Sequence, residues 1–475
     1  MTLACLVRER LPGARAMYGT QAPRALWGLG RSLSILFLCL VMPCHGASAQ
    51  GDLAGPLMPP DTVPDANKLT LTQAIEIGLR QNPQVTVARH QVAGSVANLA
   101  GQRAPLNPLL SVTGTTHTTG TLDPADPSKY GVLYTFETSG RRGLRTAQAK
   151  AQLLGAQADA LTTSLTVRWD VASAYITLQV ANSQYENARS NFETAKRLSD
   201  LTEQQVTLGA APEANALRAR IGLTQAEQAL LRAGSEVRLD RANLNLQLGR
   251  NATDAVDAAD PLIYHPVVLK PEDLERAALA NRPEIRSAEA AGSALQAAVK
   301  IEKSQHRPDL VLGVNPRALV HGQVELGVVL PLLDLGSIRG SVRRAEEDVR
   351  AQEAQTETER QRVRLEVQAA YLDLLRSQRL VESYQGGILP RAQSLLSRIE
   401  LGYQLGASSI LELMDAQQTL RSTRNDYYQA LGDHGMALAQ LSRSIGGPLP
   451  EVAAPVPAAA PAQGGTPPSA PSPVP

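Results

Sequence analysis

The chain has 475 residues and a formal net charge of +1, and aromatic residues make up only 3% of it. So small an aromatic share, with long stretches dominated by Ala, Leu, Gln, Arg and Glu, favours elongated helices over compact cores. The balanced charge argues against a polyanion partner, so we predict no nucleic-acid binding.

The first 49 residues have the features of a secretory signal peptide. A short apolar run at residues 33–42 follows several arginines and precedes Ala47-Ser48-Ala49, a small-x-small cleavage signal. The run is too short to anchor the chain, because a spanning helix needs roughly 20 apolar residues. A start at Met17 and a lipidated Cys44 are the alternatives. All three cysteines lie in this segment, so we predict a mature chain without thiol chemistry.

Residues 50–68 are rich in Pro and Gly and are predicted to be a flexible leader. The segment Leu69 to Leu79 then reads as an extended start and an amphipathic helix that stops at Pro83. The same pattern recurs from Leu269 to Leu279, with a stop at Pro283. This recurrence indicates an internal duplication.

Further glycines recur at a spacing of 197 residues: Gly143 with Gly340, Gly209 with Gly406, and Gly249 with Gly446. A repeat of this length indicates two copies of one structural module and not a solenoid array. We predict a first repeat at 69–268 and a second at 269–447, each with a helix, two strands and a long helical hairpin.

The hairpin helices are expected to be unusually long. No Pro interrupts the chain between Gly143 and Gly209, and a helix of about 65 residues would extend about 100 Å at 1.5 Å per residue. Apolar stripes of coiled-coil type run along these helices; they comprise Leu223, Leu230, Val237 and Leu244 in the first repeat, and Val363, Val367, Ala370, Leu374 and Val381 in the second. A structural coiled coil would show the same stripes.

Four segments between the helices read as strands. Apolar and polar residues alternate in Gln323–Leu330, and Tyr130–Thr138 has one apolar face, while Leu109–His117 and Asp309–Asn315 are weaker candidates. Four strands cannot close a barrel, and an open sheet edge is not tolerated in lipid. If these strands lie in a membrane, several chains must pool them. Strands of a half-buried soluble sheet would have the same pattern.

The second hairpin tip combines a helix break with two neighbouring acids. Gly406 suits the left-handed position that closes a helix, and Ser408 or Ser409 can cap the next one. Glu412 and Asp415, three residues apart, share a face of that helix. The pair either attracts cations or only solvates the helix flank.

Nothing in the chain has the pattern of a reaction centre. The seven histidines lack metal-ligand spacing, and no phosphate loop, Ser-His-Asp set or activated nucleophile is present. We therefore predict no metal, no cofactor and no enzymatic activity. Residues 448–475 are rich in Pro and Ala and are predicted to be a disordered tail.

These features together resemble the outer-membrane efflux protein family, the TolC-like channels of Gram-negative bacteria, over about residues 68–447. The motifs that carry the resemblance are the duplicated Leu-x-Leu start with its Pro stop, the turns at 139–143 and 335–340, and the tip at 403–417. The resemblance implies a mainly α fold with a small β part. It implies a homotrimer whose duplicated hairpins form an α-helical barrel, capped by a twelve-stranded transmembrane β-barrel with four strands per chain.

The resemblance also implies a function: the passive outer-membrane channel of a tripartite efflux system, embedded in outer-membrane lipid and extending into the periplasm. The implied partners are a periplasmic adaptor (membrane fusion) protein and an inner-membrane pump of the resistance-nodulation-division (RND) type, heavy-metal exporters included. An exit channel for type I protein secretion is the alternative within the class. A periplasmic adaptor or structural coiled coil is the alternative outside it, although an adaptor should carry a lipoyl-like domain between its helical arms.

Individual residues can be placed only at the tips. Glu412 and Asp415 stand where the family has acids at the tunnel entrance, Tyr403 stands where it has a constriction tyrosine, and Ser408 takes a position that can be Arg. Arg218 is the candidate counter-ion from the first repeat. The candidate adaptor contacts are the tip residues Leu208, Gly209, Ala210, Leu405, Gly406 and Ala407.

Overall fold

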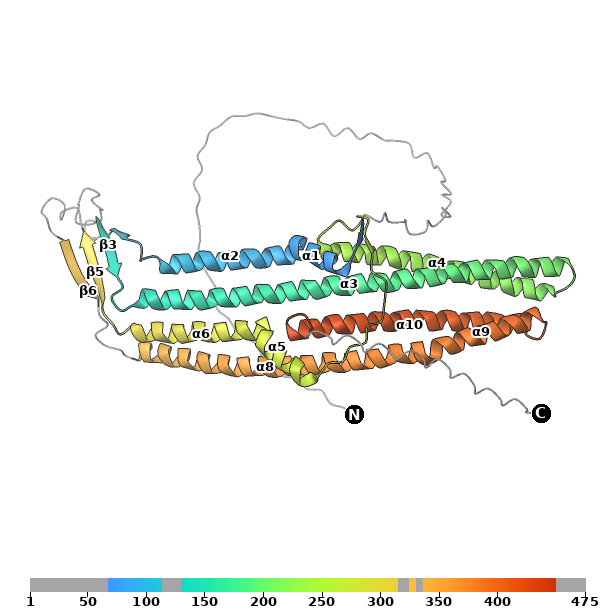
Figure 1. Ribbon diagram of the computed structural model, residues 1–475. Helices are drawn as coiled ribbons and strands as arrows, with labels where there is room; N and C mark the ends of the chain where they lie inside the picture. Colours follow the sequence, from blue (N-terminus) through green and yellow to red (C-terminus); the bar gives the residue numbers. More distant parts are fainter. Residues whose placement is uncertain (1–66, 113–129, 315–323, 330–335, 450–475) are drawn as a thin grey trace, which may run out of the picture. The chain divides into compact units, whose positions relative to one another are not determined.

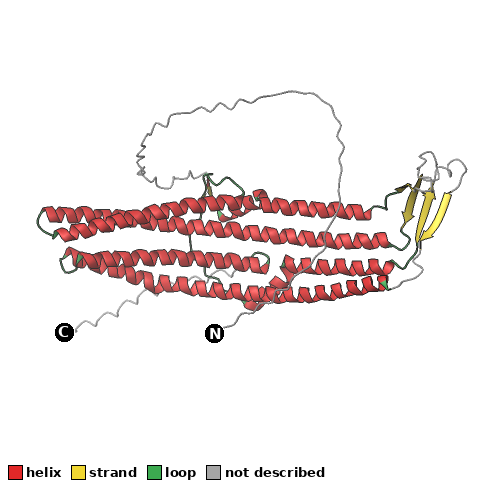
Figure 2. Cartoon of the chain, turned by 180° about the vertical axis from the view of Figure 1, so that it is seen from behind, coloured by secondary structure: helices red, strands yellow, loops and turns green. Residues whose placement is uncertain are grey.

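The computed structural model describes residues 67–112, 130–314, 324–329 and 336–449, all within the unit Leu57–Pro475. Long helices dominate this unit, and one small sheet lies at the end of the helices opposite the hairpin tips (Figures 1 and 2). The predicted mainly α chain with a small β part is confirmed. None of the described helices is both long and apolar enough to cross a membrane.

The first repeat contains β1 (Lys68–Leu69), α1 (Leu71–Gln81), α2 (Pro83–Arg103), β2 (Leu109–Val112), β3 (Tyr130–Phe136), α3 (Arg141–Thr207) and α4 (Glu213–Leu248). A capping box starts α1, because the Thr70 hydroxyl accepts from the Gln73 amide while the Gln73 side chain accepts from the Thr70 amide. Asn82 ends α1 in an extended conformation and caps α2, and Pro83 suits the first position of that helix.

After the hairpin of the first repeat comes β4 (Asp257–Ala258), which pairs with β1. The second repeat contains α5 (Pro271–Asn281), α6 (Pro283–Ser304), β5 (Asp309–Val314), β6 (Val324–Val329), α8 (Ser337–Ser383), the π-helical turn η3 (Tyr384–Ile388), α9 (Leu389–Gln404) and α10 (Ile410–Ile445). The order of its elements parallels that of the first repeat. The predicted outer limits of the two repeats stay a prediction.

Each repeat has its own apolar core, where the short helix packs on the hairpin. Leu244 and Leu248 of α4 are fully buried in the first core, and Leu441 and Ile445 of α10 take the corresponding places in the second. From the tip toward the middle of α4, buried alanines recur every seven residues, at Ala219, Ala226 and Ala233. The predicted Leu223 and Leu230 are only half-buried, because alanines let the paired helices approach more closely than leucines would.

The sheet is antiparallel with strand order β2-β3-β5-β6. Directly paired residues point to the same face, so one face carries only apolar and aromatic side chains. Its members include Leu110, Val132, Tyr134, Phe136, Leu310, Leu312, Val314, Leu326 and Val328. The other face is mixed and includes Thr135, Asp309, three glycines and the apolar Leu109, Leu133, Val311 and Val329. The alternation predicted for these strands is confirmed; His117, Asn315, Gln323 and Leu330 at the predicted strand ends lie outside the described residues.

The spacing of the two repeats changes along the hairpin. The left-handed glycines that precede α3 and α8 are Gly140 and Gly336, which are 196 positions apart, as are buried Val167 and Val363 in the middle of these helices. Beyond η3 the spacing is 197, as in Gly209 and Gly406. Pairing Gly143 with Gly340 was therefore wrong by one residue, and η3 contains the extra residue of the second repeat.

Contacts extend across three of the predicted boundaries. Lys68, assigned to the leader, pairs with Asp257 in the small parallel sheet of β1 and β4. Leu449, assigned to the tail, packs on the second core. Tyr264, assigned to the first repeat, packs on the second through Tyr384 and its neighbours, because the linker between the repeats buries its apolar side chains there. The signal peptide and the tail beyond Leu449 lie outside the described residues.

Candidate functional site

The two hairpin tips have the same backbone structure. At the first tip Gly209 has a φ of 70°, and the Ala210 amide donates to the Gln205 carbonyl oxygen at 2.7 Å. At the second tip Gly406 has a φ of 74°, and the Ala407 amide donates to the Gly402 carbonyl oxygen at 2.7 Å. Each is a Schellman motif, which closes a helix with a glycine in the left-handed region.

Each tip presents one leucine to solvent. Leu208 is 82% exposed and Leu405 is 75% exposed, and the glycine and alanine that follow each of them are also exposed. Exposed leucine next to residues with little or no side chain leaves an apolar surface that a partner helix can approach closely. The structure thus places all six predicted contact residues at the tips.

Glu412 has a structural role that the sequence analysis did not assign. Its carboxylate accepts from the Ser409 amide at 2.8 Å, and the Ser409 hydroxyl accepts from the Glu412 amide at 3.3 Å. The two residues form the capping box that starts α10. Ser409, and not Ser408, is therefore the cap. The side chain of Glu412 remains exposed, and so does that of Asp415.

Of the two predicted partners near Glu412 and Asp415, Tyr403 contacts the first repeat, whereas Arg218 of the first repeat contacts neither acid among the described residues. The Tyr403 hydroxyl donates to the Gln205 side chain at 3.5 Å and so links the ends of α9 and α3. Arg218 is exposed and forms no ion pair with Glu412 or Asp415 among the described residues. Its neighbour Arg220 does form one, with Glu203 of the same hairpin, at 2.6 Å.

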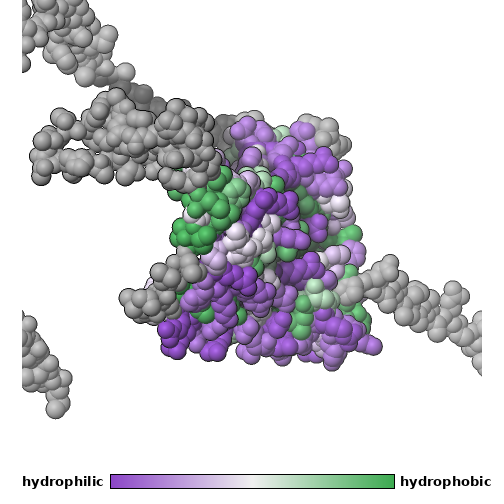
Figure 3. Space-filling model, turned by 90° about the vertical axis from the view of Figure 1, so that its left-hand side faces the viewer, coloured by the Kyte–Doolittle hydropathy of each residue, from purple (hydrophilic) through white to green (hydrophobic). Residues whose placement is uncertain are grey.

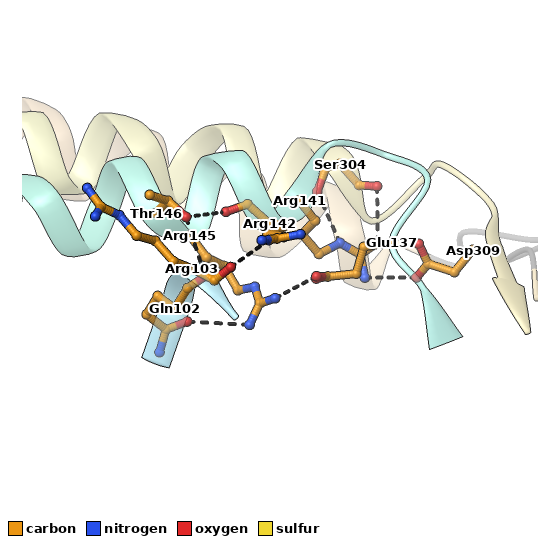
Figure 4. Close-up of polar contacts among 9 residues, drawn as sticks. All are labelled: Gln102, Arg103, Glu137, Arg141, Arg142, Arg145, Thr146, Ser304 and Asp309. Atoms are coloured by element: carbon orange, nitrogen blue, oxygen red, sulfur yellow. Dashed lines mark hydrogen bonds and ion pairs between the residues drawn. The ribbon is translucent and has the colours of Figure 1, made fainter. Parts of the chain in front are cut away.

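A second polar cluster, at the opposite end of the helices, was not predicted as a site (Figure 4). Arg141 at the start of α3 donates to Asp309 at 3.0 Å and to both oxygens of Ser304 at 3.3 Å. Arg145, one turn further, pairs with Glu137 at 2.5 Å. The contacts of Arg141 join the corner between β3 and α3 to the corner between α6 and β5, and the pair of Arg145 with Glu137 closes the first of these corners. The motif at residues 139–143 was the available signal, but it does not reveal partners about 170 positions away.

No group of three or more potential metal ligands occurs in the part of the chain that the structure describes. The arrangement that the described residues do show is a sheet with one apolar face at one end of long helical hairpins, with polar clusters at the corners and exposed tips at the other end. This is the architecture of an outer-membrane channel in which a β-sheet part is followed by a long helical part.

The chain belongs to the outer membrane efflux protein family, whose model matches residues 74–250 and 274–447. This family membership confirms the predicted location in a Gram-negative outer membrane with an extension into the periplasm. It also confirms the predicted function, the outer-membrane channel of a tripartite efflux system, and favours neither alternative. The protein is thus a member of a family of transport proteins.

Two relatives illustrate the likeness in sequence. The cobalt-zinc-cadmium resistance protein CzcC of Cupriavidus metallidurans is 24% identical over 409 residues, which cover 84% of this chain and 95% of the relative. The pyoverdine export outer membrane protein OpmQ of Pseudomonas aeruginosa is 27% identical over 413 residues, which cover 77% and 81%.

Solved structures show the same fold. A membrane protein from Pseudomonas aeruginosa superposes with a TM-score of 0.66 at 20% identity, covering 83% of this chain and 96% of that one. The CmeC outer membrane channel of Campylobacter jejuni superposes with a TM-score of 0.67 at 15% identity, covering 79% and 85%.

Proposed function

We propose that the channel is a homotrimer in which three copies pool their strands into one closed, twelve-stranded barrel. The observation that carries this proposal is the four-stranded sheet, because its edge strands β2 and β6 each pair on one side only among the described residues. One face of that sheet is apolar throughout, and a membrane tolerates no unpaired strand edge. A soluble monomer in detergent-free buffer, without conductance in planar bilayers, would contradict the proposal.

We propose that Glu412 and Asp415 line the periplasmic entrance. Three copies would place six carboxylates around the opening, and the field of such a ring attracts cations. Both side chains are exposed, and the contact between Tyr403 and Gln205 holds the second tip against the first. Because no carboxylate in the described chain neutralises Arg218, we propose that its partner is an acid of a neighbouring copy.

The test is the variant Glu412→Gln/Asp415→Asn, measured by the reversal potential in a salt gradient across a planar bilayer. Glutamine can replace glutamate in a capping box, so the start of α10 stays intact and only charge is removed. We expect cation preference to fall. The matched control is Glu193→Gln/Glu227→Gln, which removes the same charge from exposed sites on α3 and α4, and should leave the preference unchanged. If both variants have the same cation preference, Glu412 and Asp415 do not line the entrance, and they only cap α10 and keep its flank in contact with water.

We propose that both tips contact a periplasmic adaptor protein, and that the adaptor connects the channel to an RND-type pump. The exposed Leu208 and Leu405 support this proposal, as does the likeness to CzcC, a protein named for cobalt, zinc and cadmium resistance. We expect Leu208→Ser/Leu405→Ser to lose adaptor capture in a pull-down. Val268→Ser, which changes an equally exposed side chain in the linker, should retain it.

We propose that residues 1–49 are removed on export and that the tail predicted at residues 448–475 is disordered beyond Leu449. The cleavage signal at Ala47-Ser48-Ala49 and the Pro and Ala content after residue 448 support these assignments. Amino-terminal sequencing of protein purified from outer membranes should begin at Gln50. Sequence that begins upstream, or a blocked terminus at Cys44, would contradict the cleavage assignment.

A further inference from the structure

The corner where the helices meet the sheet contains more arginine than its acids can neutralise. Among the described residues, Asp309 of the sheet pairs with Arg141, and Glu137, just after β3, pairs with Arg145. Glu137 is almost fully enclosed, with 8% of its side chain exposed. The nearby Glu302 accepts a hydrogen bond from Gln305 at 2.7 Å, so these acids already have partners.

Three further arginines at the same corner have no carboxylate partner among the described residues: Arg103, Arg142 and Arg307. All three are exposed. The Nε of Arg142 donates to the Arg103 carbonyl oxygen at 2.6 Å, so these two residues are neighbours (Figure 4). A terminal N–H group of Arg307 donates a hydrogen bond to the carbonyl oxygen of Ser139, which lies just before the start of α3, at 3.3 Å.

The helix geometry turns Arg142 away from the paired acids. Successive residues of an α-helix are about 100° apart around its axis, whereas residues i and i+4 share a face. Arg141 and Arg145 therefore point together toward Asp309 and Glu137, and Arg142 points elsewhere. Its bond to the end of α2 confirms that direction.

The apolar face of the sheet begins directly beside these arginines. Phe136 lies five residues before Arg141 and makes an edge-to-face pair with Tyr134, with ring centroids 4.5 Å apart. Tyrosine, here Tyr134, is one of the two residue types that are enriched at the boundary between hydrocarbon and headgroups. Figure 3 shows hydrophobic residues gathered on the sheet and a largely hydrophilic surface on the neighbouring helices.

We infer that Arg103, Arg142 and Arg307 bind the phosphate groups of anionic phospholipids in the periplasmic leaflet of the outer membrane. Guanidinium groups match phosphate oxygens in a bidentate geometry, and basic residues next to a membrane-embedded surface attract anionic headgroups. The inference rests on the proposed function, because it requires the sheet to lie in lipid. It assigns the boundary of that lipid to the corner between β3 and α3.

The experiment is native mass spectrometry of the purified full chain in neutral detergent, with phosphatidylglycerol and phosphatidylcholine added in equal amounts. We expect wild-type protein to retain phosphatidylglycerol preferentially and to lose it as salt rises. Arg103→Gln/Arg142→Gln/Arg307→Gln should reduce that preference by about fivefold or more, since each arginine near a membrane surface contributes to headgroup attraction. Inorganic phosphate at the same concentration should not displace the lipid.

The control variant is Arg232→Gln/Arg379→Gln/Arg398→Gln, which removes three exposed arginines from helices away from the sheet. It should retain the wild-type preference. A wild-type protein that takes both lipids equally would overturn the inference, whether or not the first variant folds, and so would equal loss in both variants. Displacement by inorganic phosphate would reassign the site to a free anion. Conductance in bilayers of neutral lipid separates the outcomes: channels without lipid preference refute only this inference, whereas no channels refute the proposed function.

Discussion

The two hairpins of the chain have the same backbone arrangement, but only the second has an interruption in its first long helix. Both end in a Schellman tip, and the return helices α4 and α10 occupy positions that correspond residue by residue. The first long helix, α3, runs unbroken for 67 residues, whereas its counterpart is divided by the π-helical turn η3 into α8 and α9. A π-helical turn accommodates an added residue inside an α-helix. The apolar seam of the second hairpin therefore stays in register, because a single turn contains the insertion.

We expect the largest effect from deleting one residue in the first long helix of each hairpin, from η3 in the second hairpin and from α3 in the first. Removing Gly387 should convert η3 to regular helix and leave the seam aligned, so the protein should fold with an equal or higher melting temperature. Removing Ser190 from α3 should rotate the rest of that helix by about 100° and turn buried Leu198 and Thr202 out of their contacts. We expect that variant to fail to assemble, as measured by its trimer yield. Equal yields from both deletions would contradict this interpretation of η3.

The junction between the short helices provides the next contrast. In the second repeat Arg282 is 5% exposed. It pairs with Glu284 at 3.2 Å and with Glu366, and it donates to the Arg443 carbonyl oxygen. In the first repeat the corresponding residue is Asn82, which donates to the Gln247 carbonyl oxygen at 2.9 Å. We expect Arg282→Met to cost about 3 kcal/mol, because it leaves carboxylates without their buried partner.

Asn82→Ala should cost about 1–2 kcal/mol, since it removes one buried hydrogen bond and a helix cap. Urea denaturation of both variants under the same conditions gives the comparison. The reverse order of cost would show that the ion pair contributes little and that the two junctions are energetically alike.

The glycines that close the return helices should also respond unequally. Gly249 has a φ of 73°, and an added Cβ would lie 2.6 Å from the Gln81 carbonyl oxygen. Gly446 has a φ of 79°, and its nearest atom would be the Arg282 Cα at 3.2 Å. Either change to alanine costs about 1–2 kcal/mol for the left-handed backbone. Gly249→Ala should add the cost of moving α1, and calorimetry should find its melting temperature the lower of the two.

The smallest predicted difference concerns pH. His434 is buried where the first repeat has Val237, and its ring nitrogens contact the Ser377 hydroxyl at 3.4 Å and the His265 carbonyl oxygen at 3.1 Å. Burial lowers the pKa of His434 from its ordinary value of 6.5. The folded chain therefore binds fewer protons than the unfolded chain, and stability falls as the pH drops below about 6.5.

His434→Gln should weaken this decline between pH 7.5 and pH 5.5, measured as the change in melting temperature. His265→Gln removes an exposed ring from the same contact region and should preserve most of the decline, because burial is the largest cause of the lowered pKa of His434 and the charge of His265 is a smaller one. Loss of the pH dependence in both variants would assign it to the linker and not to the buried ring.

Local signals made much of the fold predictable from the sequence. Gly209 and Gly406 identified the tips because a left-handed residue strongly favours glycine, and Pro83 and Pro283 identified the breaks between short helices. Period-two alternation identified the strands. The η3 turn was not predicted, because aligning Gly143 with Gly340 concealed the change of spacing, although Gly386, Gly387 and Pro390 interrupt the helical pattern at that point.

The site was predictable only in part. The capping role of Glu412 was visible in the spacing of Ser409 and Glu412, but the pair of acids drew the interpretation toward charge alone. The pairing of Arg141 with Asp309 was not visible, since only the folded chain brings residues 168 positions apart together. The entrance itself requires more than one copy of the chain, so neither the sequence nor the fold of one chain determines it.

The most direct test of the whole account is electron cryomicroscopy of the purified full chain in lipid nanodiscs. We expect three copies around one axis, with the strands closed into a single barrel within the lipid disc. Glu412 and Asp415 should face the axis at the far end of the helices. A particle whose sheets remain open and lie outside the lipid disc, or whose second tips face away from the axis, would contradict it.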